Sequence, residues 1–237
     1  MDQVPQRHLL NQFVVVEEKV DGANAAISFD ELGQLQLQSR GHFLTGGQRE
    51  KHFNLFKTWA MQHRSTLFDL LGKSLVLYGE WMYAKHTIFY DALPHYFLEF
   101  DILDRSTGEF WSTVKRQSHL KGSPIHSVPV LWQGTWQIQH QPENWLRKSL
   151  YQTGDWWQRL HQQSQNQGLD PQRIARETDP NPLAEGLYLK IEEGEKVIGR
   201  LKWIRASFLT QVVESGSHWL NRPIIPNQLQ DKDVLFK

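Results

Sequence analysis

The stretch Glu18-Lys19-Val20-Asp21-Gly22-Ala23-Asn24 joins two predicted strands and decides how the chain is interpreted. The apolar residues 13–16 predict a β-strand that ends at the lysine, and Asp21-Gly22 is a turn dipeptide. A lysine at a strand end is held rigidly, and its neutral amine is a good nucleophile toward an activated phosphate. Its ordinary pKa, about 10.4, must then be lowered by burial, by neighbouring cations or by a metal ion.

The pattern Lys-x-Asp-Gly alone is short, and it is expected by chance in about one chain in twenty of this length. If the lysine is a nucleophile, the rest of the chain should supply cations, carboxylates and a base pocket. Five further segments carry such residues: Ser39-Arg40-Gly41, Tyr78-Gly79-Glu80-Trp81, Phe100-Asp101-Ile102, Glu185-Gly186-Leu187-Tyr188-Leu189-Lys190 and Arg200-Leu201-Lys202-Trp203.

Together with the lysine motif, these segments resemble, in the correct order, the motifs of the covalent nucleotidyltransferases: DNA ligases, RNA ligases and mRNA capping enzymes. Glu18-Lys19 followed by Gly22 and Asn24 is similar to the form found in one RNA-ligase branch. That branch is typified by the phage enzyme that seals nicks in duplex RNA. The match spans Lys19 to Lys202, most of the chain.

The resemblance implies an ATP-dependent RNA ligase that needs ATP and Mg²⁺ or Mn²⁺. Such an enzyme forms lysyl-AMP, transfers AMP to a 5′-phosphate end and joins that end to a 3′-hydroxyl. The partner is then RNA with these ends, a nicked duplex included. Three alternatives stay open: the same chemistry on DNA, transfer to another acceptor, and a non-catalytic nucleotide-binding module in a repair complex.

The resemblance also assigns roles to single residues, beginning with Lys19 as the catalytic nucleophile. Arg40 contacts a phosphate, either of ATP or of the nucleic-acid 5′ end, because a guanidinium donates two parallel hydrogen bonds. Glu80 holds the ribose hydroxyls, and Phe100 stacks on adenine, a place for which Phe97 on the same strand competes. The residues expected to bind nucleotide are Glu18, Asn24, Arg40, Glu80, Phe100, Lys190, Arg200 and Lys202.

The last two motifs imply the metal site and the cations. Glu185 helps to bind the divalent metal and holds Lys19 in place. Lys190 and Lys202 neutralise the triphosphate charge in the transition state and are expected to lower the pKa of Lys19. Arg200 stands where the phage branch has lysine; it keeps the charge but not the point-like geometry, which makes Lys202 the stronger candidate.

The segments around the motifs predict an α+β fold with mostly antiparallel sheets, an ATP-grasp-like nucleotidyltransferase ligase core. A helix is expected from Arg49 to Leu71, ended by Gly72, and a loop at 170–182. We expect a single domain over 1–237 with a Gln- and Trp-rich helical insertion around 132–168. The expected strands are 13–18, 25–29, 35–39, 74–78, 96–103, 186–190 and 197–204.

A C-terminal OB-fold is not expected, because the residues after Lys202 are too few for its five strands. A partner protein is therefore a candidate for recognising the nick or the end. The formal net charge is +0, with 26 Lys+Arg against 26 Asp+Glu, so nucleic-acid contacts must be local. No cysteine is present, which excludes disulfides and thiolate chemistry. Residues 1–5 show no leader pattern and no apolar run is membrane-spanning, so we expect a cytoplasmic protein without a membrane partner.

Overall fold

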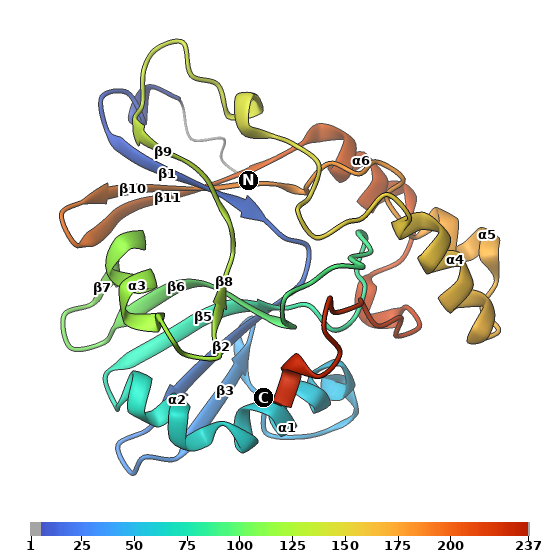
Figure 1. The fold of residues 1–237 in the computed structure, drawn as a ribbon, viewed down its shortest axis with the longest axis horizontal. Helices are drawn as coiled ribbons and strands as arrows, with labels where there is room; N and C mark the ends of the chain where they lie inside the picture. The colour runs from blue at the N-terminus through green and yellow to red at the C-terminus, as the bar shows by residue number, and fades with distance from the viewer. Residues whose placement is uncertain (1–5, 237) are drawn as a thin grey trace.

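The fold is described from a computed structural model that covers residues 6–236 (Figure 1). The expectation drawn from residues 1–5, that no leader is present, lies outside the described residues. The β-strands are β1 (Phe13–Lys19), β2 (Ala23–Phe29), β3 (Leu35–Ser39), β4 (His42–Phe43), β5 (Leu75–Trp81), β6 (Phe97–Asp104), β7 (Glu109–Trp111), β8 (His126–Ser127), β9 (Val130–Thr135), β10 (Gly186–Glu193) and β11 (Lys196–Ile204). The α-helices are α1 (Asn54–Gln62), α2 (Arg64–Leu71), α3 (Thr113–Leu120), α4 (Trp156–Asn166), α5 (Pro171–Arg176) and α6 (Ala206–Glu214). The 3₁₀ turns are η1 (Gln6–His8), η2 (Gln48–Phe53), η3 (Pro142–Trp145), η4 (Trp219–Asn221) and η5 (Val234–Phe236).

The strands form one connected sheet that folds over into two halves. Its order is β4-β3-β2-β5-β6-β7-β11-β10-β1-β9, and β8 pairs with β6 off this path. In Figure 1, β9, β1, β10 and β11 lie above β6, β5, β2 and β3, and α1 and α2 cover the lower half. Neighbours along the path are antiparallel, and β8 pairs with β6 in parallel. The expected α+β fold with mostly antiparallel strands is therefore confirmed.

Two local expectations are wrong. The single helix predicted from Arg49 to Leu71 is divided, because His63 (φ −93°, ψ 14°) leaves helical geometry between α1 and α2. Gly72 (φ 51°) ends α2 as predicted. The loop predicted at 170–182 contains α5, whose start is capped by the Asp170 side chain.

The segment 132–168 combines strand and helix. Its first residues belong to β9, which pairs with β1 along the edge of the upper half. The helical structure within it consists of η3 and α4. Over residues 6–236, no helix is both long enough and apolar enough to cross a membrane.

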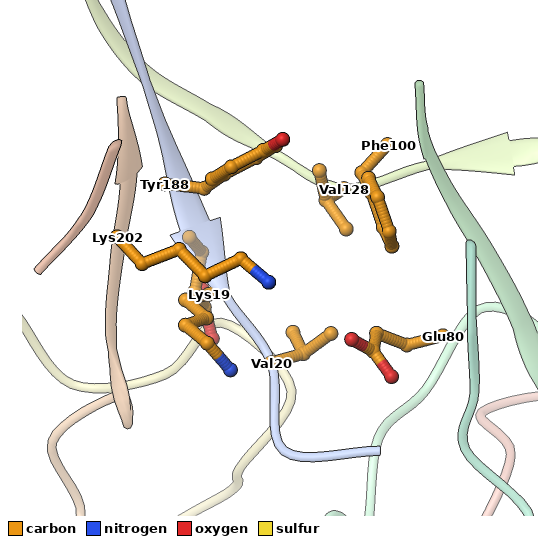
Figure 2. A pocket seen from close by; sticks show the side chains of 8 residues that line it. Lys19, Val20, Glu80, Phe100, Val128, Tyr188 and Lys202 are labelled. Carbon is orange, nitrogen blue, oxygen red and sulfur yellow. The ribbon is translucent and has the colours of Figure 1, made fainter. Parts of the chain in front are cut away.

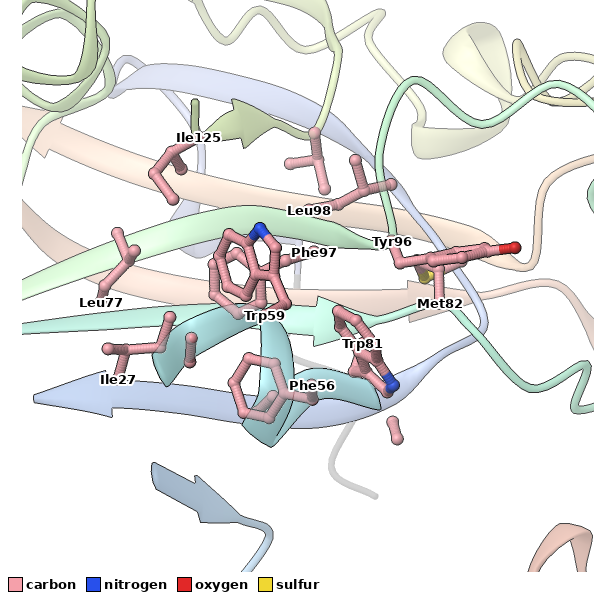
Figure 3. Close-up of a cluster of buried hydrophobic side chains, with 14 of the residues drawn as sticks. Ile27, Phe56, Trp59, Leu77, Trp81, Met82, Tyr96, Phe97, Leu98 and Ile125 are labelled. Carbon is pink, nitrogen blue, oxygen red and sulfur yellow. The ribbon is translucent and has the colours of Figure 1, made fainter. Parts of the chain in front are cut away.

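An aromatic stack forms the centre of the core between α1 and the lower half of the sheet (Figure 3). The ring of Phe97 lies 5.7 Å from that of Phe56 and 5.6 Å from that of Trp59, stacked in both cases. All three side chains are fully buried. Phe97 is therefore a core residue, which leaves Phe100 as the ring of this strand available to a ligand.

A network of buried charges connects the two halves of the sheet. The Arg116 guanidinium of α3 donates to the carboxylates of Glu17 on β1 and Glu99 on β6, with all three side chains fully buried. Lys190 on β10 lies 2.9 Å from Glu17 and 3.1 Å from Asp101 on β6. Burial alone would lower the pKa of Arg116, but the carboxylates of Glu99 and Glu17 outweigh it and raise this pKa. Paired ions thus replace apolar packing at this junction.

Truncating the aromatic stack should destabilise the fold strongly. Trp59→Ala removes a fully buried ring that the surrounding core cannot refill, so we expect a loss of about 3–5 kcal/mol in the free energy of unfolding. Met61→Ala on the same helix removes a side chain that is 62% exposed and should change this free energy by less than about 0.5 kcal/mol. Urea denaturation of both variants measures the difference; equal effects would contradict this assignment of the core.

Removing one cation from the buried network should be equally costly. Arg116→Met leaves the carboxylates of Glu17 and Glu99 buried without their shared partner, and we expect a loss of about 3–5 kcal/mol. The neighbouring Lys115→Met breaks only a pair with Glu195, 79% exposed, and should cost less than about 1 kcal/mol. Thermal and urea unfolding of the two variants compare them directly, and a mild Arg116→Met effect would show that the network is not a structural support.

Candidate active site

The candidate nucleophile Lys19 is the last residue of β1, and strand register brings its acidic partner to it. In the pairing of β1 with β10, Lys19 lies opposite Gly186, so the preceding Glu185 comes beside the amine. The distance from Lys19 Nζ to Glu185 Oε1 is 2.6 Å. A side chain at Gly186 would be only 2.1 Å from the carbonyl oxygen of Trp203, so glycine is needed there. The fourth motif therefore contributes both a carboxylate and the close strand contact that positions it.

The Asp21-Gly22 turn fixes the chain beyond the lysine. The Asp21 carboxylate accepts hydrogen bonds from the N–H groups of Thr87 (2.7 Å) and Ile88 (2.9 Å). These bonds attach the turn to the buried loop that follows β5. A side chain at Gly22 would come within 2.5 Å of the sulfur of Met82 and 3.2 Å of the Trp81 carbonyl oxygen, so it would displace the Met82 side chain that packs against this turn. The turn is thus a structural anchor for the lysine rather than a surface feature.

A pocket of about 330 Å³ opens beside the lysine between the two halves of the sheet (Figure 2). The ring of Phe100 and the ring of Tyr188, from opposite halves, lie 5.7 Å apart at 82°. The Phe100 ring is partly exposed and can stack on a flat aromatic ligand, while the charged groups beside it suit phosphate and hydroxyl groups. The lining residues are Glu18, Lys19, Val20, Glu80, Phe100, Val128, Tyr188 and Lys202.

Two buried carboxylates beside the lysine are poorly satisfied. Burial raises the pKa of Glu80 to about 8 and that of Glu185 to about 7, although the cations of Lys19 and Lys202 act in the opposite direction. Oε2 of each is buried without a hydrogen-bond partner among the described residues. Unpartnered buried oxygens of this kind are suited to a ligand hydroxyl or a cation.

The sequence-based expectation of a lowered Lys19 pKa is wrong for the protein without ligands. Burial lowers this pKa, but the carboxylates of Glu185 and Glu80 outweigh burial and leave it raised. The neighbouring Lys202 has a lowered pKa, because of burial first and of the Lys19 charge second. The lysine is therefore held as an ammonium ion until something offsets the two carboxylates.

Most of the predicted site residues gather at or beside this pocket. Asn24 and Arg200 line an adjoining hollow that shares Phe100, Tyr188 and Lys202 with the pocket. Glu18 borders the pocket, but its carboxylate accepts hydrogen bonds from the Ser149 hydroxyl and, at 3.3 Å, from the Leu150 N–H. We therefore assign the Glu18 side chain to holding the 149–150 loop, which leaves its backbone to border the ligand. Arg40 lines a separate groove next to Asn24.

Lys190 is placed away from the pocket surface. Its side chain is fully buried, and its amine contacts Glu17, Asp101 and the carbonyl of Phe100. In this position it supports the strand that carries Phe100 and does not face a ligand. The presence of a lysine in the motif is compatible with either role, so the sequence could not show whether Lys190 supports the strand or binds phosphate.

The predicted site residues do not include three that line the pocket: Val20, Val128 and Tyr188. Tyr188 contributes a ring, and its hydroxyl donates to Asp101 at 2.9 Å, which fixes the ring in place. The alternation of β10 was a usable signal, because it puts Tyr188 on the same side as Lys190. Val128 comes from the short segment at β8, and no sequence pattern pointed to it.

Comparisons with known proteins agree on one family. The family model for RNA ligase matches residues 12–204. A solved structure of a lysine-to-alanine mutant of RNA ligase from Naegleria gruberi with ATP and Mn is 17% identical, with a TM-score of 0.57, over 88% of this chain and 53% of that one. RNA ligase from the same organism with PPi is 18% identical, with a TM-score of 0.56, over 89% of this chain and 57% of that one. A comparison with proteins of curated function finds no match.

At these identities the structural likeness establishes the fold, and the chain spans just over half the length of the chains it matches. The family model covers most of the chain, and the matched range contains the lysine motif and every other segment that lines the pocket. The protein belongs to the RNA ligase family.

Proposed function

We propose that the protein is an ATP-dependent RNA ligase that forms lysyl-AMP on Lys19, passes AMP to a 5′-phosphate end and seals it to a 3′-hydroxyl. One observation carries this proposal: a strand-end lysine paired with a buried carboxylate at 2.6 Å, beside a pocket lined by two aromatic rings and two more charged groups. The form of the lysine motif supports the branch typified by the phage nick-sealing enzyme.

Adenine would stack on the partly exposed Phe100 ring, and Glu80 would accept hydrogen bonds from the ribose hydroxyls. No three His, Asp or Glu side chains converge on one point in residues 6–236, so a divalent metal would need ligands from the triphosphate itself. Mg²⁺ is commonly held this way, by one or two carboxylates plus substrate phosphates. The unpartnered Oε2 of Glu185 fits such a metal, which would neutralise phosphate charge.

In the first step, the Lys19 amine attacks the α-phosphorus; a P–N bond forms, and the bond to pyrophosphate breaks. The amine must lose its extra proton first. A cation held at Glu185 would offset the carboxylate that most raises the Lys19 pKa, so that the proton could leave to solvent. Lys202 lies where it can neutralise the charge that develops on the phosphates.

In the second step, an oxygen of the RNA 5′-phosphate attacks the phosphorus of lysyl-AMP, and Lys19 leaves as the amine. Arg40, on the turn after β3, is placed to hold that phosphate. In the third step, the 3′-hydroxyl attacks the 5′-phosphate, and AMP leaves as the new phosphodiester forms.

The lysyl-AMP step can be tested with α-labelled ATP and Mn²⁺. Wild-type protein should keep the label after denaturation, whereas Lys19→Ala and Lys19→Arg should both lose it. Lys19→Arg tests the nucleophile more specifically than Lys19→Ala, because it keeps a cation beside Glu185 and removes only the nucleophilic amine. An unlabelled wild type, or label that persists in either variant, refutes the assignment.

The pH dependence of lysyl-AMP formation should rise with pH. Lys19 has a raised pKa and reacts only as the neutral amine, and Glu185 and Glu80 ionise as the pH passes their pKa values of about 7 and about 8. Loss of the Lys19 proton favours reaction at higher pH, and ionised Glu185 can hold the cation that offsets its own effect on the Lys19 pKa, so the rate should be low below pH 7 and increase above pH 8.

A pH–rate profile of single-turnover labelling measures this effect. Glu185→Gln removes the main group that raises the Lys19 pKa, so the alkaline limb of its weaker profile should move to lower pH. A profile that falls between neutral and alkaline pH would contradict the proposed protonation states.

A further inference from the structure

A second groove, distinct from the aromatic pocket, runs beside the candidate active site. One side is formed by the β3–β4 turn, and the other by η4 near the C-terminal end of the described chain. The residues that line it are Ala23, Asn24, Ser39, Arg40, His42, Gly46, Gly47, Glu50, Phe53, His218, Trp219 and Leu220. Its empty space is about 1270 Å³, several times that of the pocket beside Lys19.

The groove is continuous with the active site. Asn24 lines both the groove and the hollow that contains Lys202 and Phe100. Arg40 is exposed in the groove, and its charge helps to lower the pKa of Lys202, after burial and after the stronger effect of Lys19. A strand in this groove would therefore have one end beside the reacting lysine.

The groove offers little repulsion to a polyanion. Glu50 is the only carboxylate among the described residues that line it. That carboxylate is paired with Lys57 and accepts hydrogen bonds from the N–H groups of Thr45 (3.1 Å) and Gly46 (2.9 Å). Its charge is thus neutralised by Lys57 of α1 and by two loop N–H groups, and Arg40 is the one permanent cation among the described residues that line the groove.

Trp219 is built into the groove as a fixed ring. Its indole stacks on the imidazole of His86, with the ring centres 3.9 Å apart and the planes 20° apart, and His52 meets it edge-on at 5.2 Å. The segment that carries it is held by buried Arg222, which donates to the His86 carbonyl and, at 2.8 Å, to the Ser217 carbonyl. The indole itself is only half-buried. A rigid, partly exposed indole in a groove that also contains an arginine is a combination that binds unpaired bases.

Resting on the ligase function proposed above, we infer that this groove binds the 5′-phosphate-bearing RNA strand, with an unpaired base stacked on Trp219 and the terminal phosphate at Arg40. Trp219 is a positioning residue in this scheme and does not touch the reacting atoms. The groove thereby places the attacking 5′-phosphate toward the lysine.

The test is direct binding of a fluorescent, 5′-phosphorylated oligoribonucleotide, measured by anisotropy without ATP. Trp219→Ala should raise the Kd about tenfold, because it removes one stacked base contact. Trp219→Phe keeps an aromatic face and should stay within about threefold of wild type. The matched control is Trp145→Ala: Trp145 is also a half-buried indole beside a histidine, 5.3 Å from the His140 ring, but it lies on η3 outside the groove.

Labelling by ATP, run on the same preparations, separates this inference from the ligase function. If wild type forms lysyl-AMP and the affinity for RNA does not depend on Trp219, the groove assignment is overturned while the function stands. If no lysyl-AMP forms but Trp219→Ala still weakens RNA binding, the groove stands and the function fails. Equal weakening in Trp219→Phe and Trp219→Ala overturns the stacking role, because the phenylalanine ring retains it.

Discussion

The shared carboxylate of Glu17 is the constraint on which the architecture depends. Arg116 and Lys190 both bind it inside the protein, and through them β1 is joined to α3, β10 and β6. Removing such charges from water is costly, so they favour the one arrangement in which every ion is paired. Glu17 lies two residues before Lys19 on the same strand face, which transmits this fixed geometry to the candidate nucleophile.

The same network shapes the pocket. Lys190 also contacts Asp101, which accepts the hydrogen bond from the Tyr188 hydroxyl. The position of the Tyr188 ring, one wall of the pocket, is therefore fixed by the buried charges of Asp101 and Lys190. The opposite wall, Phe100, lies on the strand that contains Asp101. Because buried ion pairs fix both walls, the pocket is preorganised, and less conformational entropy is lost when a ligand binds.

The sequence predicts the antiparallel α+β fold and most residues of the pocket. It predicts less well the burial and the charged neighbours of those residues. Motif order was enough to bring Lys19, Glu185, Glu80 and Lys202 together, because each lies within two residues of the end of a strand of the same sheet. It was not enough to place Lys190, whose acidic partners come from strands far apart in the chain. The raised Lys19 pKa was missed for the same reason: it depends on distances between charges and on burial, and a one-dimensional pattern contains neither.

The neutral balance of charges, 26 against 26, limits how such a protein can hold RNA. Without a broad positive surface, phosphate contacts are few, and the affinity they provide would be lost readily as salt increases. Stacking on an indole has no such salt dependence, and it accepts any base. A single arginine for the terminal phosphate, together with one aromatic ring for a base, therefore recognises an end in preference to the length of a strand. For the proposed reaction at ends, this division suits the chemistry, because a terminal phosphate and the base beside it are the groups that must be held near Lys19.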